Sequence, residues 1–260
     1  MSYLDEVFGV AGKSVLVTGG SRGIGLAIAE GFVKAGARVY ISARDAAVCD
    51  EAAAELSKYG TCVSLPANAA TKDGRQKLVD ALKAHETKLD VLINNAGAIW
   101  AAPFAEYPES GWDKVFDLNV KAVFFLTQLL LPMLEASASP RDPARIINVG
   151  SMNVLRIPTH ETYAYVASKA ALHQMTRHLA GQIAARHINA NVIAPGLYPS
   201  KMQVAMIEKK GLETLVAPIP LKRLANETDM AAAALYLASK AGSYLTGAVI
   251  PVDGGMATTI

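Results

Sequence analysis

The stretch Thr18–Gly25, which reads TGGSRGIG, decides the fold because it joins a short apolar run directly to a segment with helical spacing. The run Lys13–Thr18 (KSVLVT) has the composition of a buried strand, and Ile24–Ala35 has the spacing of an amphipathic helix. Glycines in such a turn let backbone N–H groups approach a pyrophosphate, and the helix N-terminus adds the positive end of its dipole. The spacing is G-x-x-x-G-x-G rather than G-x-G-x-x-G, so the general dinucleotide fingerprint is not matched.

The same alternation of short apolar runs and amphipathic segments continues along the chain. Further strands are expected at Arg38–Ala43, Thr61–Pro66, Leu89–Ile93, Arg145–Val149, Ile188–Ala194 and Ala248–Val252. Further helices are expected at Ala46–Ser57, Arg75–His85, Trp112–Leu134, Tyr165–Arg186 and Asp229–Leu237. This order predicts an α/β fold, a Rossmann-like doubly wound parallel sheet of about seven strands with helices on both faces. No linker divides the chain, so residues 1–260 are expected to form a single domain, with a cofactor half at about 12–150 and a catalytic and substrate half at about 151–255.

Composition narrows the class of protein. Of 260 residues, 52% are hydrophobic and 18% are charged, which excludes disorder as the main state. The net charge of +2, with no basic run, disfavours a nucleic-acid partner.

The N-terminus and the most apolar segment bear on localisation. Met1–Glu6 lacks the basic and apolar regions of a signal peptide, and the two cysteines are too few for a disulfide framework. The most apolar segment, Leu118–Leu134, contains Lys121 and Pro132, so a buried helix is expected there rather than a membrane span. We therefore expect a cytoplasmic protein that does not associate with a membrane.

Several motifs occur together in a fixed order. They are the Thr18–Gly25 turn, Asn94–Gly97 (NNAG), Asn119 within LNV, Ser151 after the fifth strand, Tyr165-x-x-x-Lys169, Pro195-Gly196, and Asp253–Gly255. This ordered set, covering about residues 12–255, resembles the short-chain dehydrogenase/reductase family. The sequence around Tyr163–Tyr165 and Pro195–Ser200 is most similar to that of 3-oxoacyl-[acyl-carrier-protein] reductases of the rhamnolipid-pathway type.

The spacing of Tyr165 and Lys169 indicates acid–base chemistry. Residues four apart share one face of a helix, and a nearby ammonium is expected to lower the pKa of a tyrosine. The resemblance implies that Ser151 holds the substrate oxygen and that Asn119 keeps the middle helix open for a water chain reaching Lys169. Tyr163 is rejected as the acid because residue 167, four positions on, is Ala167. The expected reaction is hydride transfer to a carbonyl carbon with proton donation from Tyr165.

The end of the second strand indicates which nicotinamide cofactor binds. An NAD-binding protein would place Asp or Glu there, whereas this chain has Ala43 followed by Arg44. The guanidinium of Arg44 can pair with the 2′-phosphate of NADP(H), and Arg22 is a second candidate partner for that phosphate. Asp45 is expected to cap the next helix. NADP(H) is therefore the expected cofactor. The expected contacts, partly by resemblance, are Gly19, Ser21, Arg22, Gly23, Ile24, Gly25, Arg44, Asn68, Asn95, Ala96, Gly97, Tyr165, Lys169, Pro195, Gly196, Tyr198 and Ser200.

One cofactor position departs from the family pattern. Asn68 stands where the family usually carries Asp, although its amide carbonyl can still accept a hydrogen bond from the adenine amino group.

The substrate and metal predictions rest on fewer residues. Expected substrate contacts are Trp100, Met152, Asn153, Tyr163, Tyr165 and Met202, the last within an apolar segment expected to cover the substrate. No metal site is expected, because the five histidines show no ligand spacing and are taken as solvated or packing side chains.

Three functions stay open at this stage. They are an NADPH-dependent 3-oxoacyl reductase, a ketoreductase or alcohol dehydrogenase for other apolar substrates, and a dinucleotide-sensing protein without turnover. An acyl carrier protein is a candidate partner, with Arg141, Arg177 and Arg186 as candidate docking residues. The helices Trp112–Leu134 and Tyr165–Arg186 are apolar on more than one side, which predicts a homo-oligomer, a dimer or a tetramer.

Overall fold

The computed structural model describes residues 2–199 and 211–259, and its seven parallel strands form one sheet in the order β3-β2-β1-β4-β5-β6-β7. The strands are β1 (Ser14–Thr18), β2 (Arg38–Ser42), β3 (Cys62–Ser64), β4 (Val91–Asn94), β5 (Ala144–Val149), β6 (Ile188–Pro195) and β7 (Val249–Val252). The helices are α1 (Tyr3–Phe8), α2 (Gly23–Lys34), α3 (Ala46–Leu56), α4 (Lys72–Lys83), α5 (Glu109–Phe116), α6 (Ala122–Ser137), α7 (Tyr163–Ile183), α9 (Leu212–Val216) and α10 (Glu227–Ala238). The predicted doubly wound α/β fold is confirmed.

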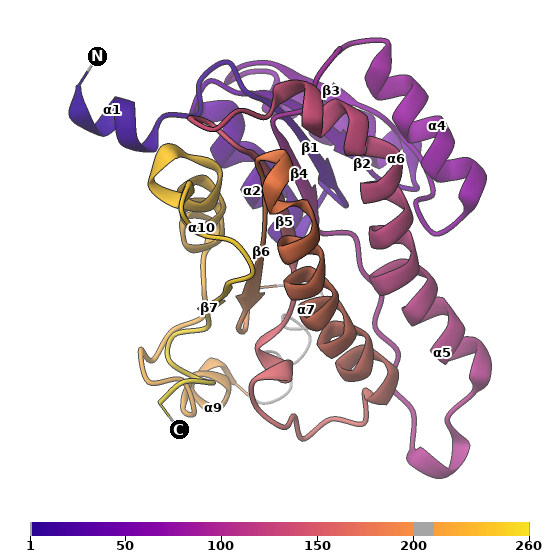
Figure 1. Ribbon diagram of the computed structural model, residues 1–260. Helices are drawn as coiled ribbons and strands as arrows, with labels where there is room; N and C mark the ends of the chain where they lie inside the picture. Colours follow the sequence, from indigo (N-terminus) through magenta and orange to yellow (C-terminus); the bar gives the residue numbers. More distant parts are fainter. Residues whose placement is uncertain (1, 200–210, 260) are drawn as a thin grey trace.

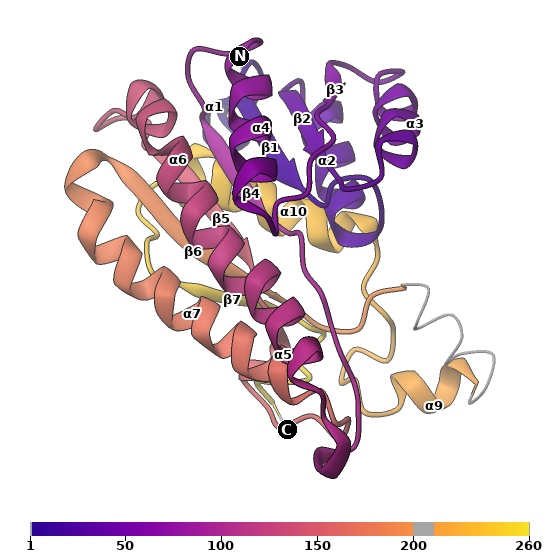
Figure 2. The same cartoon turned by 90° about the vertical axis from the view of Figure 1, so that its right-hand side faces the viewer.

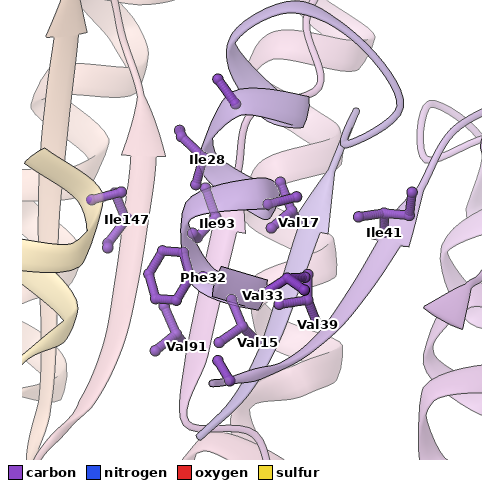
Figure 3. Close-up of a cluster of buried hydrophobic side chains, with 14 of the residues drawn as sticks. Val15, Val17, Ile28, Phe32, Val33, Val39, Ile41, Val91, Ile93 and Ile147 are labelled. Atoms are coloured by element: carbon purple, nitrogen blue, oxygen red, sulfur yellow. The ribbon is translucent and has the colours of Figure 1, made fainter. Parts of the chain in front are cut away.

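Apolar side chains at successive strand positions explain why helices cover both faces of the sheet. Side chains alternate across a strand, so Val15 and Val17 face one side and Leu16 faces the other. Figure 3 shows Ile28, Phe32 and Val33 of α2 packed against strand residues of the first face, which α3 and α10 also cover. Helices α4, α6 and α7 pack on the opposite face (Figures 1 and 2).

The strand order creates a crevice at one edge of the sheet. The chain builds outward from β1 through β2 to β3, and then returns to form β4 on the other side of β1. The segments that follow β1 and β4 therefore leave the carboxyl ends of these adjacent strands toward opposite faces of the sheet. Parallel α/β sheets bind ligands at this kind of reversal.

The predicted helix Trp112–Leu134 differs from the observed one in its middle. The structure has α5, then a π-helical turn at Asp117–Lys121, then α6, so the helical segment spans Glu109–Ser137. This segment is long and apolar enough to cross a membrane by length and composition, a test that core helices also pass. Its buried side, with Leu126, Leu130 and Leu134, packs on the sheet as a core helix does.

A buried arginine ties the end of α10 to the sheet. Arg145 in β5 is 1% exposed, and its guanidinium donates to the carbonyl oxygens of Leu237 and Ser239 at 3.1 Å, and also to that of Pro143. Carbonyl groups at a helix C-terminus lack partners within the helix, so this side chain satisfies groups that the fold buries.

We expect Arg145→Met to destabilise the protein by about 1–3 kcal/mol, because it leaves buried carbonyl oxygens without donors. Urea unfolding measures this loss, and Arg141→Met is the matched control since Arg141 is exposed. Equal stability of the two variants would show that the Arg145 contacts contribute nothing.

Candidate active site

A cavity of about 240 Å³ opens at the carboxyl ends of β1, β2 and β4, where the strand order reverses. Its lining residues are Thr18, Gly19, Ser21, Arg22, Ser42, Ala43, Arg44, Ala67, Ala69, Asn95, Ala96, Gly97 and Leu118. Many of the residues predicted to bind the cofactor are therefore brought together at the place where the fold accepts a ligand.

The glycine turn is shaped by close approaches that only glycine permits. Gly19 has a φ of +66°, and a Cβ at Gly25 would lie 2.3 Å from the carbonyl oxygen of Gly19 and from Asn95 Nδ2. No side chain in the described part of the chain caps the first turn of α2, which begins at Gly23. The free N–H groups of that turn are suited to hold an anion.

Asn95 connects the NNAG segment to the glycine turn. Its Nδ2 donates to the carbonyl oxygens of Thr18 and Gly19, both at 3.0 Å. The Thr18 hydroxyl oxygen in turn accepts from the N–H groups of Asn95 and Ala96 at 3.1 Å. These reciprocal bonds hold the two sides of the cavity at a fixed separation.

The end of β2 carries cations and no free carboxylate. Arg22 and Arg44 line the cavity, are exposed, and form no ion pair with any described residue. The Asp45 carboxylate accepts from the N–H of Val48 and caps α3, as predicted. Ser42 also lines the cavity, and its buried hydroxyl has no partner within the described protein. The glycine cradle, the unpartnered hydroxyl and the two guanidinium groups fit a dinucleotide with a 2′-phosphate.

Other predicted cofactor residues are not among those that line this cavity. The exposed Asn68 uses its Oδ1 to accept from the N–H of Ala70 at 3.2 Å. Gly196 follows β6, and its N–H donates to the carbonyl oxygen of Val252. The Tyr198 side chain packs in the core, with its hydroxyl donating to Glu227 at 3.4 Å. Ser200 and Met202 lie outside the described residues.

Helix α7 carries the predicted tyrosine and lysine on one face. Lys169 is 4% exposed, and its Nζ donates to the carbonyl oxygen of Val149 at 2.7 Å and lies 5.8 Å from the centre of the Tyr165 ring. Ser151 follows β5, and its Oγ accepts from the N–H of Asn153 at 3.2 Å, which leaves the hydroxyl proton free to donate.

The electrostatics of this group differ from the expectation drawn from spacing alone. Burial raises the pKa of Tyr165, and a hydrogen bond to Ser151 only partly opposes that rise. Burial also lowers the pKa of Lys169 to about 8, because no carboxylate compensates the ammonium. Desolvation is the largest effect on both groups, and the lowering of the Tyr165 pKa by the Lys169 ammonium stays a prediction.

Asn119 lies in the π-helical turn and is fully buried. Its Oδ1 accepts from the N–H of Ala98 at 2.7 Å, and its Nδ2 donates at 2.9 Å to the carbonyl oxygen of Ala98 and to the Ser168 hydroxyl. Gly97 lies between the cavity and this group: a Cβ there would be 3.3 Å from Asn119 Oδ1 and 3.6 Å from Lys169 Nζ. The cavity and the α7 residues therefore form one continuous site.

Two of the predicted substrate contacts, Trp100 and Met152, pack against other parts of the protein. Trp100 packs against Gly111 of α5, with Lys114 Nζ 5.1 Å from its ring. Met152 is buried in a small cluster with Ile219 and Met256. These two side chains therefore serve packing in the structure.

Asn153 and Tyr163 are more exposed to solvent. Asn153 is half-buried beside Ser151. Tyr163 is 40% exposed, its hydroxyl donates to Glu161, and its ring contacts Phe104 and Tyr107 edge-on.

Sequence reasoning missed His173. It is 5% exposed, and its Nε2 accepts a hydrogen bond from the N–H of Ser151 at 3.3 Å. The signal was its position four residues after Lys169 on the same face of α7, which continues the Tyr165–Lys169 spacing.

Comparisons with known proteins agree with this architecture. A family profile described as enoyl-(acyl carrier protein) reductase matches residues 19–257. The chain is 49% identical to a rhamnolipids biosynthesis 3-oxoacyl-[acyl-carrier-protein] reductase from Pseudomonas aeruginosa, over 95% of this chain and 97% of that one. It is 36% identical to a galactitol 2-dehydrogenase (L-tagatose-forming) from Cereibacter sphaeroides, over 96% of each chain.

A solved structure gives the same result. The Pseudomonas aeruginosa RhlG/NADP active-site complex superposes with a TM-score of 0.94 at 49% identity, covering 97% of this chain and 99% of that one. The profile, the identity and the superposition together show that this chain belongs to the short-chain dehydrogenase/reductase family of oxidoreductases.

Proposed function

We propose that this chain is an NADPH-dependent reductase that converts the ketone of a 3-oxoacyl thioester into a secondary alcohol. The observation that carries the proposal is the placement of Ser151, Tyr165 and the buried Lys169 next to the cavity that the glycine turn lines. Arg22 and Arg44 at the mouth of that cavity support NADP(H) over NAD(H).

Each side chain has a distinct part in the reaction. Bound NADPH supplies the hydride that forms the new C–H bond at the carbonyl carbon. The Ser151 hydroxyl donates a hydrogen bond to the carbonyl oxygen and orients it toward Tyr165. The Tyr165 hydroxyl gives its proton to that oxygen as the C=O double bond becomes a single bond, and the resulting phenolate is stabilised by Lys169.

Lys169 is suited to restore that proton. Its pKa of about 8 lies close to neutral pH, so the ammonium can lose and regain a proton during turnover. Asn119, within the π-helical turn and bonded to Ser168 beside Lys169, supports the proton route toward solvent that the family resemblance implies.

An apolar rim beside the site supports a substrate with an acyl chain. Phe104 is 77% exposed and Tyr163, which contacts Phe104 edge-on, is 40% exposed. Exposed apolar side chains gathered near a site favour a hydrophobic ligand. The 49% identical relative is named for action on 3-oxoacyl-[acyl-carrier-protein], which supports the thioester.

Carriage of the thioester by an acyl carrier protein is part of the proposal. Arg141 and Arg177 are exposed and can meet an acidic partner. Arg186 pairs with Glu135 at 2.6 Å, which reduces its contribution to such docking.

The second candidate function is reduction or oxidation of other apolar ketones and secondary alcohols. The apolar rim favours this second function equally, because apolar side chains would bind any hydrophobic substrate, whether or not it is a thioester. A sensing protein without turnover is disfavoured, because Ser151 and Lys169 are buried and Tyr165 lies half-buried on the same helix as Lys169.

We also propose a cytoplasmic homo-oligomer, a dimer or a tetramer. Phe124 and Phe125 on α6 are each about two-fifths exposed, at 43% and 40%, and their rings contact each other edge-on. Pairing of this face with a second copy would remove that apolar area from water.

The substrate proposal predicts a profile over a panel of ketones. With NADPH, kcat/KM for 3-oxoacyl thioesters should exceed that for simple ketones of similar size by at least roughly tenfold, because a site that makes polar contacts with its substrate rejects an analogue that lacks those groups. Comparing the same 3-oxoacyl group on coenzyme A and on an acyl carrier protein tests docking. Higher kcat/KM for simple ketones would replace the first function with the second.

The cofactor proposal predicts the effect of Arg44→Ala. Loss of a charge-assisted hydrogen bond to a 2′-phosphate should raise the Kd of NADPH roughly 10- to 100-fold. NADH, which lacks that phosphate, is the internal control, and its Kd should stay within about twofold. Fluorescence titration gives both constants, and an equal loss for both cofactors would remove Arg44 from the phosphate site.

A further inference from the structure

Helix α7 contacts the turn after β5 at two successive positions. Lys169 Nζ donates to the carbonyl oxygen of Val149, and one helical turn later His173 Nε2 accepts the N–H of Ser151 at 3.3 Å. The two side chains therefore hold the backbone on either side of Gly150. Ser151, which the proposed reaction uses to bind the substrate oxygen, lies at the end of this held segment.

The sequence makes room for the imidazole at Gly150. A Cβ at this position would lie 2.1 Å from His173 Nε2 and 2.6 Å from Val192 Cγ1. The N–H of Gly150 donates to the carbonyl oxygen of Ile193 at 2.7 Å, which continues the sheet. The next N–H, that of Ser151, faces the imidazole instead.

The imidazole is held in the form that can accept this bond. Burial lowers the pKa of His173 to about 4, and the charges of Lys169 and Arg177 act in the same direction. The ring is therefore neutral at neutral pH, and because Nε2 accepts, the proton resides on Nδ1.

Ser151 is thereby fixed at both its backbone and its side chain. Its N–H is bound by His173, its Oγ accepts from the N–H of Asn153, and its carbonyl oxygen accepts from the N–H of Val154. The hydroxyl proton is the remaining donor, and the Ser151 hydroxyl is also hydrogen-bonded to Tyr165.

We propose that His173 is a positioning residue for the carbonyl reduction, which fixes the Ser151 hydroxyl toward the substrate oxygen through its bond to the Ser151 N–H. The inference rests on the proposed function, since it assigns His173 a part in the step that Ser151 serves. His173 contacts neither cofactor nor substrate in this account.

His173→Leu removes the acceptor at similar volume, and His173→Gln keeps an acceptor oxygen near the position of Nε2. Displacing a reacting group by about 1 Å costs on the order of 100-fold, so we expect His173→Leu to lower kcat roughly 10- to 100-fold. The Kd of NADPH should change less than about twofold. His173→Gln should recover most of kcat, and His178→Leu, at an exposed histidine on the same helix, is the matched control.

A double-mutant cycle separates positioning from packing. In a Ser151→Ala background, His173→Leu should change kcat little, because its effect acts through the missing hydroxyl. An equal loss in both backgrounds, or a His173→Gln variant as slow as His173→Leu, would overturn the inference. If His173→Leu does not fold, His173→Gln against the shorter His173→Asn makes the same comparison.

The outcomes also distinguish this inference from the proposed function. An impaired Ser151→Ala with a fully active His173→Leu refutes the positioning role and leaves the reductase site standing. A fully active Ser151→Ala refutes both, because it removes Ser151 from the reaction.

Discussion

A charged group inside the protein, the ammonium of Lys169, ties α7 to the end of β5 by donating to the carbonyl oxygen of Val149. Tyr165 lies one turn before it and Ser168 lies beside it, so this contact sets where both are presented. Burial lowers the pKa of Lys169 to about 8, so the ammonium can release and regain a proton near neutral pH.

A second set of contacts connects this lysine to the dinucleotide cavity. The Asn119 side chain hydrogen-bonds both the N–H and the carbonyl oxygen of Ala98. It also donates to the hydroxyl of Ser168, the residue before Lys169. Asn95 fixes the preceding residues to the glycine turn. The segment after β4 is thus held from both ends, and a ligand in the cavity meets a site that is already formed.

The sequence predicted the strand–helix order and the approximate position of every strand, because strands buried on both faces leave a distinct apolar pattern. Of the polar residues it predicted to bind the cofactor, Ser21, Arg22, Arg44 and Asn95 line the cavity, whereas Asn68 does not. Side-chain direction was less predictable. Trp100 packs on α5, and Tyr198 points into the core, because neighbours distant in sequence decide where a large ring finds space. His173 was passed over because its partner is a backbone N–H that no motif marks.

In the proposed reaction Tyr165, presented by α7 next to Ser151, donates the proton to the substrate oxygen, and the Tyr165→Phe variant removes that donor alone. Tyr163→Phe is the matched control, because that hydroxyl bonds Glu161 at the rim. General acid catalysis contributes about 10²–10⁴-fold, so steady-state kinetics should show kcat of Tyr165→Phe falling by at least 100-fold. The Kd of NADPH should stay nearly unchanged, and Tyr163→Phe should retain most activity. An active Tyr165→Phe enzyme, or an inactive Tyr163→Phe enzyme, would contradict the account.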